Sequence, residues 1–232
     1  MGGHACGSRG DARGSGRDDV WVFIMDGVAP VLFAVALALA SEGIAAETTH
    51  PRVEPPPVTV FFQFESAPNG RTFQFMRAEI DRLFATVPLR FDWLRIEEAP
   101  EAGVVGEAMV VRFRGNCSLG GVPPLADERG PFAWATVTDG VVQPFADVNC
   151  DRVRVAVHDG MWGSERAHAD RYLGIGLARV VAHEIYHIYF RSKRHESGGV
   201  MRHALTPMDL VAEKAELHPE DRAGARKALR RD

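Results

Sequence analysis

A long helical pattern that ends in a histidine motif constrains the fold of this chain more than any other feature. Between about residues 168 and 190, apolar residues recur at helical spacing: Leu173, Leu177, Val180, Val181, Ile185 and Ile188. The motif His183-Glu184-x-x-His187 lies inside this stretch. Residues four apart share one face of an α-helix, so both imidazoles can face one ion. The pattern therefore predicts a long helix that carries a candidate metal site.

Short strand patterns precede this helix. The stretch VTVFFQFE predicts a strand that starts near Val58, and RTFQFMRAEIDRLFATV predicts an amphipathic helix after it. Further strand patterns, separated by loops rich in Gly, Pro and Asp, are FDWLRIEE, AMVVRFRG, FAWATV and DRVRVAVH. Two shorter helices are expected from Pro207 and from Pro219. We therefore expect an α+β fold: a mixed sheet of about five strands with one covering helix, the long helix, and a small helical C-terminal lobe.

Composition places the chain among globular proteins and argues against nucleic acid as a partner. The chain has 232 residues, of which 46% are apolar and 25% charged, and it can bury one sizeable core. Its formal net charge is −4, and Lys and Arg form no stripe with interleaved aromatic residues. Nucleic-acid binding is therefore not expected.

The first 46 residues are typical of a targeting segment. An Arg- and Gly-rich lead precedes an uncharged run, Gly27 to Ser41, that is short for a membrane span and suits a signal peptide. An uncleaved membrane anchor and a buried core helix are the alternatives. Residues 47–57, rich in Pro, Glu and Thr, indicate a linker, so the folded domain is expected over residues 58–232. A signal or anchor would make the domain secreted or periplasmic, in the second case with a membrane tether.

The cysteines agree with export. Cys6 lies in the lead, which leaves Cys117 and Cys150 as an even pair in the exported domain. A disulfide between them would close a loop of about 34 residues and stabilise the fold by about 3–4 kcal/mol. Two buried free thiols are the alternative. Neither cysteine has C-x-x-C spacing, so we assign neither to a metal.

Residues after the helix extend the motif to a candidate zinc site. Catalytic zinc needs three protein ligands and one open position, and His195 offers a third nitrogen in the following loop. The glycines of SGGVM permit a tight turn before Met201, which could form an apolar floor under the metal. Glu184 is placed to take the proton of a water that zinc activates. The alternatives are a solvent-facing histidine at 195 and an ordinary core methionine at 201.

At these residues the chain resembles the metzincin clan of zinc endopeptidases. The clan's motif is HExxHxxGxxHxxG/D followed by a Met-turn. Here the third histidine comes two residues later, Phe190 stands at the bending glycine, and the methionine follows after only five residues. The segment HEIYHIYFRSKRHESGGVM is also similar to uncharacterised exported bacterial proteins with HELxHxxxxxxxHxxxGxM.

The resemblance implies a zincin fold with zinc on the three histidines, Glu184 as general base and Met201 in the Met-turn. It also implies that a peptide substrate lies antiparallel along an edge strand, for which residues 131–137 are the candidate. His203 stands roughly where related enzymes carry a tyrosine that steadies the oxyanion, although a surface histidine is the alternative.

The sequence therefore predicts an exported zinc metallopeptidase that acts on peptides or proteins. One alternative is a non-catalytic zinc-binding module of the same fold that binds a protein partner. Another is a membrane-tethered processing factor with a single protein substrate. A different zincin layout would take its third ligand from a later helix, where Glu213 and Glu216 are available. We expect His195 instead, because the glutamates also suit a solvated helix face beside Lys214.

Overall fold

The computed structural model describes residues 57–87, 89–99, 106–120 and 130–217, all within one compact unit, Pro51–Asp232. The expected targeting segment, the linker up to residue 56 and the expected helix from Pro219 lie outside the described residues. Within the described ranges, no helix combines the length and the hydropathy that crossing a membrane requires.

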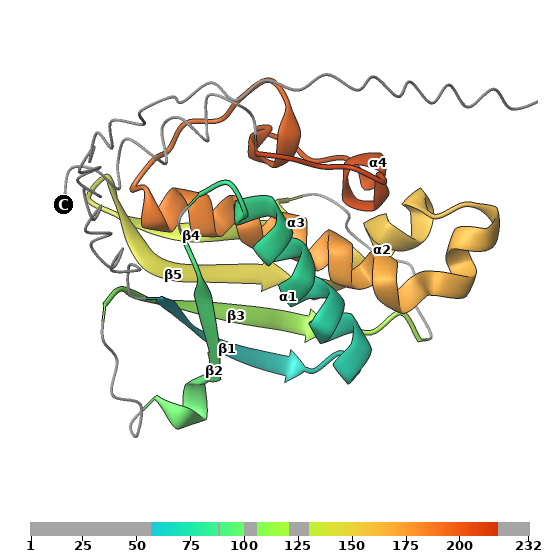
Figure 1. Cartoon of the computed structure of the whole chain (residues 1–232), viewed down its shortest axis with the longest axis horizontal. Coiled ribbons are helices and arrows are strands. Elements are labelled where there is room, and N and C mark those ends of the chain that lie inside the picture. Colours follow the sequence, from blue (N-terminus) through green and yellow to red (C-terminus); the bar gives the residue numbers. More distant parts are fainter. Residues whose placement is uncertain (1–56, 88, 100–105, 121–129, 218–232) are drawn as a thin grey trace, which may run out of the picture. The chain divides into compact units, whose positions relative to one another are not determined.

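Five strands form one mixed sheet in the order β2-β1-β3-β5-β4 (Figure 1). The parallel strands are β1 (Val58–Ser66), β2 (Phe91–Arg95), β3 (Ala108–Asn116) and β5 (Val141–Asn149). β4 (Ala133–Thr138) pairs antiparallel with β5 and forms one edge of the sheet. The expected edge strand is therefore present, and its outer side is not paired with any other described strand.

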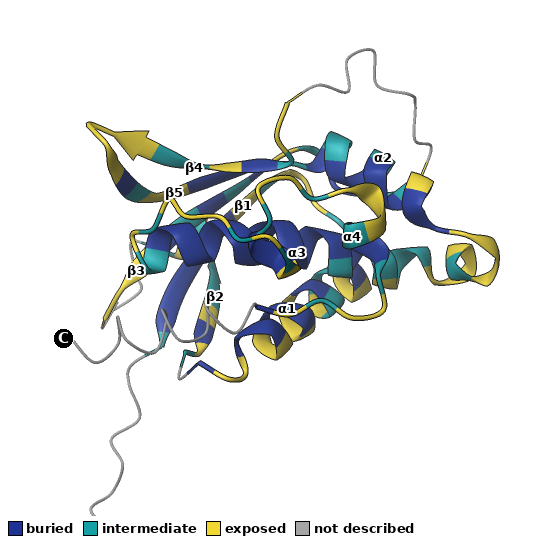
Figure 2. Ribbon diagram, turned by 90° about the horizontal axis from the view of Figure 1, so that it is seen from above, coloured by how far each residue is buried: buried dark blue, intermediate teal, exposed yellow. Residues whose placement is uncertain are grey.

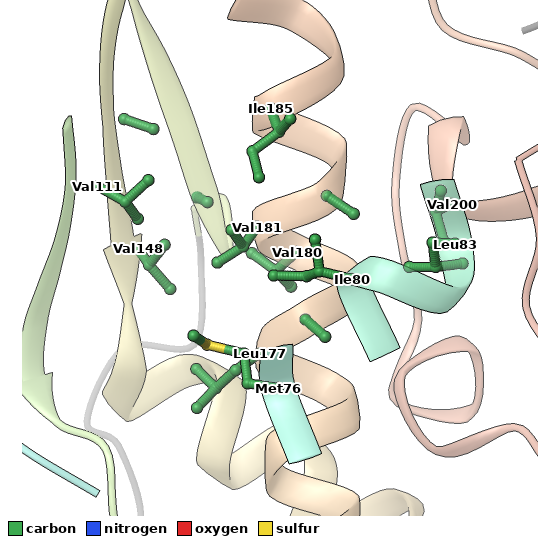
Figure 3. Packing of buried hydrophobic residues seen from close by; sticks show 14 of the residues in the cluster. Met76, Ile80, Leu83, Val111, Val148, Leu177, Val180, Val181, Ile185 and Val200 are labelled. Carbon is green, nitrogen blue, oxygen red and sulfur yellow. The ribbon is translucent and has the colours of Figure 1, made fainter. Parts of the chain in front are cut away.

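The core fills the space between the sheet and two helices. α1 (Gly70–Phe84) begins at Asn69, whose side chain accepts a hydrogen bond from the Thr72 amide at 2.9 Å, and α3 (Ala169–Tyr189) packs beside it. Buried side chains of both helices meet those of the central strands (Figure 3): Met76, Ile80, Leu83, Val111, Val148, Leu177, Val181 and Ile185. Nearly the whole of α3 is buried (Figure 2), so its two motif histidines are held by a packed scaffold.

A glycine in α3 permits the close approach of α1. A Cβ at Gly174 would lie 2.6 Å from the Thr72 carbonyl oxygen, which is closer than real Cβ atoms come. Substitution at this position would therefore push the two helices apart.

One predicted strand is wrong. Residues 151–158, DRVRVAVH, lie in α2 (Cys150–Gly160), which begins after Asn149, whose side chain accepts a hydrogen bond from the Arg152 amide. The alternating valines suggested a period of two, but the buried pair Val153 and Val157 is four residues apart, as one helix face requires. The helix cap and the packing decided against the strand.

The fifth strand lies one segment earlier. β5 contains Pro144, and proline is disfavoured inside a sheet because it lacks an amide hydrogen. Pairing with β3 starts only at Phe145, and the β4 register shifts between Ala135 and Val137, so Pro144 lies in an irregular stretch. The sheet tolerates the proline there.

A buried arginine fastens the C-terminal segment to α3. α4 (Pro207–Val211) begins at the expected proline, with the Thr206 side chain as its cap. Arg179, which is 1% exposed, donates to the carbonyls of Asp209 and Ala212, both at 2.6 Å. Residues 209–212 are thereby held against the helix that carries the histidines. Short 3-10 helices η1 (Ile96–Glu98) and η2 (Gly163–His168) complete the described connections.

The predicted disulfide between Cys117 and Cys150 is present, and both cysteines are fully buried. It joins the residue after β3 to the first residue of α2. Free thiols are therefore not the state of this pair.

Replacing both cysteines by alanine is expected to lower the free energy of unfolding by about 3 kcal/mol, because the open loop adds conformational entropy to the unfolded chain. Urea denaturation of the oxidised domain and of the double variant measures the difference. A reducing agent should shift the midpoint of the unsubstituted domain and leave that of the variant unchanged. Equal midpoints for the oxidised domain and the variant would contradict the expectation.

Candidate metal centre

The end of α3 turns the chain back toward the helix. Arg191 takes a left-handed backbone conformation, with φ of 47°. The Ser192 amide donates to the His187 carbonyl at 3.1 Å, and the Arg191 amide to the Ile188 carbonyl at 3.2 Å. These two bonds form a Schellman ending. The reversal lets His195 return to the helix.

Three imidazoles converge after this reversal. The Nε2 atom of His187 lies 3.0 Å from that of His183 and 3.3 Å from that of His195. The candidate ligand atoms of the three residues all lie within 4.8 Å of one another. His183 and His187 are buried, whereas His195 is exposed. The predicted ligands therefore form one cluster that is open on the His195 side.

Backbone carbonyls determine which ring nitrogen carries the hydrogen. Nδ1 of His183 lies 2.7 Å from the Val200 carbonyl oxygen, and Nδ1 of His187 lies 2.6 Å from that of Ser192. A carbonyl only accepts, so Nδ1 must be the donor in both rings. In the neutral rings, Nε2 then presents a lone pair toward the centre of the cluster.

This arrangement fits a zinc ion. The two Nε2 lone pairs, 3.0 Å apart on His183 and His187, cannot form a hydrogen bond with each other. A cation between them removes their repulsion. Nitrogen ligands placed tetrahedrally around zinc at about 2.0–2.1 Å lie about 3.3 Å from each other, close to the spacing here. The residues present thus suit the metal in donor type, tautomer and distance.

Residues 196–201, the candidate Met-turn segment, hold one of these carbonyls in place. This segment contains η3 (Gly199–Met201), in which Gly199 takes a φ of 66° whereas Gly198 is extended. Only one of the two glycines therefore uses its left-handed freedom. The Glu196 amide donates to the Met201 carbonyl at 2.8 Å and closes the turn, and Met201 itself is fully buried. The turn places Val200 where its carbonyl meets His183.

Glu184 lies buried between the helix and the edge strand. Its carboxylate accepts a hydrogen bond from the backbone amide of Ala135 in β4, which favours the charged form and lowers its pKa. Burial has the larger effect and raises the pKa of Glu184 to about 7. A carboxyl group with a pKa near neutrality can both accept and return a proton.

The pKa values of the three imidazoles are lowered, whereas that of Glu184 is raised. Burial lowers the pKa of His183 to about 4, and it lowers the pKa of His187 and of His195. The neighbouring rings add to this effect on each of them. All three rings are therefore ready to bind metal as neutral ligands.

The other predicted candidates lie outside the ligand group. His203 is exposed, and its ring centroid lies 4.8 Å from that of His195, so it borders the site. Its role in oxyanion support stays a prediction. Glu213 and Glu216 are exposed and do not belong to the three-histidine group found among the described residues.

A cavity of about 310 Å³ adjoins the cluster. It is lined by residues 130–133 before and at the start of β4, Arg152 of α2, Val180, His183 and Glu184 of α3, and residues 202–205 after the Met-turn segment. Arg152 belongs to no recognisable motif, and the strand predicted over residues 151–158 gave no reason to expect it at this cavity.

The mixed five-stranded sheet, its antiparallel edge strand and the covering helices confirm the expected α+β architecture. No protein-family model matches the chain, and no curated protein matches its sequence. Among solved structures, the chain is similar to archaemetzincin from Methanopyrus kandleri, with 12% sequence identity and a TM-score of 0.44. The match covers 78% of this chain and 98% of that one.

Proposed function

We propose that this protein is a zinc-dependent metallopeptidase. The observation that carries the proposal is the convergence of the His183, His187 and His195 Nε2 atoms beside the buried carboxyl group of Glu184. This group lies next to an edge strand that can pair with an extended peptide. Ligands, base and substrate-binding strand are thus supplied within one site.

Residues of this chain position the substrate and transfer the proton during hydrolysis. Zinc, when bound, supplies Lewis acidity that polarises a peptide carbonyl and makes water a nucleophile near neutral pH. Glu184 takes the proton of the attacking water and returns it to the leaving amine. The backbone of β4 aligns the peptide, and His203 is a candidate to donate a hydrogen bond to the developing oxyanion.

A non-catalytic zinc module is the less favoured alternative. A module that only binds metal requires neither a buried carboxyl group beside the ligands nor an adjoining cavity. Glu184 is 6% exposed, although burying a carboxyl group costs free energy, and it lines the cavity. These features favour catalysis.

The experiment that tests the proposal is metal analysis of the purified, oxidised domain, followed by exposure to a mixed peptide library. We expect about one zinc per chain and cleavage that a chelator stops and added zinc restores. A zinc-loaded domain that cleaves no peptide would favour the binding module.

We further propose that the domain is exported through its N-terminal segment, with cleavage before Ser41 or Glu47. The Cys117–Cys150 disulfide supports this, because such bonds persist in oxidising compartments. N-terminal sequencing of the natively produced protein decides between cleavage and anchoring, since an intact N-terminus in the membrane fraction would indicate a tether.

Zinc is expected to stay bound in mildly acidic solution. Burial lowers the pKa of each candidate ligand below the ordinary histidine value, that of His183 to about 4, so protonation competes with zinc only at a pH below the ordinary histidine range. Zinc content after dialysis should be full at about pH 6 and mostly lost at about pH 4. Loss of half the zinc already at about pH 6.5 would contradict the expectation.

A further inference from the structure

Arg152 lines the cavity together with Glu184, and two of its guanidinium nitrogens have no hydrogen-bond partner among the described residues. Its guanidinium carbon lies 5.5 Å from the centroid of the Phe132 ring, a cation–π contact that orients the side chain. Its Nε and Nη1 atoms are buried, and no described residue offers either atom a hydrogen-bond acceptor. Buried donors without an acceptor are rare because they cost free energy.

Acidic groups nearby are engaged with other partners. Arg202, the second arginine of the cavity, binds both carboxylate oxygens of Asp209, at 2.9 and 3.0 Å. Asp151, the chain neighbour of Arg152, accepts from the Arg154 side chain at 3.1 Å. Within the described part of the chain, Arg152 is therefore the cavity's uncompensated cation.

The chemistry of Arg152 indicates what it would bind. A guanidinium group is a planar fork of donors that matches the two oxygens of a carboxylate, and it stays charged at any physiological pH. In a peptide, a carboxylate is supplied by an Asp or Glu side chain or by the free C-terminus. A cavity of about 310 Å³ has room for such a group together with part of its residue.

The position of the cavity along β4 indicates which side of the substrate it receives. Glu184 contacts the edge strand at Ala135, whereas the cavity is lined by residues 130–133, which precede Ala135. Antiparallel pairing is slightly more stable per residue than parallel pairing, so a peptide added to β4 is expected to run from the Thr138 end toward the Ala133 end. The cavity would then face the residues on the C-terminal side of the scissile bond.

We propose that Arg152 is a specificity-determining residue that binds a substrate carboxylate on the C-terminal side of the scissile bond. This inference rests on the proposed peptidase function and deepens it. The enzyme would prefer peptides with an acidic residue, or with the free C-terminus, directly after the cleaved bond.

Matched peptides test the substrate class. One set carries Glu, Gln or Lys after the scissile bond within an otherwise neutral, end-blocked peptide. A second set ends one residue after that bond, with a free or an amidated C-terminus. We expect kcat/KM to favour the carboxylate over its neutral amide counterpart by about 10- to 100-fold in at least one set. The set that shows the preference identifies the source of the carboxylate, and equal rates in both sets would overturn the proposal.

Variants assign the preference to Arg152. In Arg152→Gln the Glu-to-Gln, or acid-to-amide, ratio of kcat/KM should fall to about 1, and Arg152→Lys should retain part of it. The matched control is Arg171→Gln, an equal charge change at an exposed position of α3 about 18 Å along the helix axis from His183. The control should keep the full ratio. A full ratio in Arg152→Gln would refute the assignment.

A binding measurement separates failure of this inference from failure of the proposed function. Calorimetry on the zinc-loaded Glu184→Gln variant compares the carboxylate and amide peptides without turnover. Tighter binding of the carboxylate peptide, lost when Arg152→Gln is added, supports Arg152 even if the native protein cleaves nothing. Equal binding refutes it even if cleavage occurs. If circular dichroism shows that Arg152→Gln is unfolded, the same binding comparison is made between Arg152→Lys and the unsubstituted protein. A weaker preference for the carboxylate peptide in Arg152→Lys supports the role of Arg152, and an equal preference refutes it.

Discussion

Replacing His195 by alanine should lower the affinity for zinc by more than about 100-fold and abolish peptide hydrolysis. Loss of residues that merely orient a zinc ligand costs about 10- to 100-fold, so loss of a ligand should cost more. The Nε2 atom of His195 lies 3.3 Å from that of His187, within the ligand group. Competition with a chromophoric chelator measures the affinity, and cleavage of the best library peptide measures the activity.

The controls for this prediction are Glu213→Ala and Glu216→Ala, the residues that a glutamate-ligand site would use. Both side chains are exposed and outside the histidine cluster, so zinc affinity and hydrolysis should stay nearly unchanged. If one of these variants lost zinc while His195→Ala kept it, the third ligand would be a glutamate and the site would belong to a different zincin class.

Glu184→Gln should abolish most of the hydrolysis while leaving zinc bound. The substitution keeps the size of the side chain and its ability to accept a hydrogen bond from the Ala135 amide, but it removes the group that takes the proton. Loss of a general base lowers kcat by about 10²- to 10⁴-fold. Zinc content by elemental analysis and kcat for one cleaved peptide are the two measurements.

Glu97→Gln is the matched control for this substitution. Glu97 is exposed in η1, which follows β2 at the edge of the sheet opposite β4, so the variant should keep its full kcat. If Glu184→Gln also kept its kcat, another residue would have to serve as general base. If it lost its zinc, its effect on catalysis could not be assigned to proton transfer.

The parts of the fold that were predicted correctly depend on local patterns. α1 and α3 carry apolar residues at helical spacing, and β1, β3 and β4 are short runs of β-branched and aromatic residues. The strand predicted over residues 151–158 was wrong because alternating valines are compatible with either a strand or a short helix. The cap at Asn149 and the burial of Val153 and Val157 decide between them, and burial depends on the neighbouring elements.

The sequence predicted that the chain reverses after the long helix, but it did not predict the residue at which the reversal occurs. The resemblance to metzincins placed the bend at Phe190, where the motif has glycine. The left-handed residue is Arg191, one position later, and the two hydrogen bonds of the Schellman ending hold it there. A non-glycine residue in this conformation costs about 1–2 kcal/mol, so sequence alone gives little reason to expect it.

The sequence by itself determined which side chains are candidate ligands, the helical spacing that lets His183 and His187 share a face, and the cysteine pair. Each follows from side-chain chemistry and from the period of the helix. Only the tertiary structure decided the tautomers of the ligands and the contact between Glu184 and β4. The same holds for the place of Arg152 at the cavity, where two of its nitrogens find no acceptor among the described residues. These features arise between residues that are distant in the chain, and they depend on which backbone groups the packing brings together. No local sequence pattern therefore encodes them.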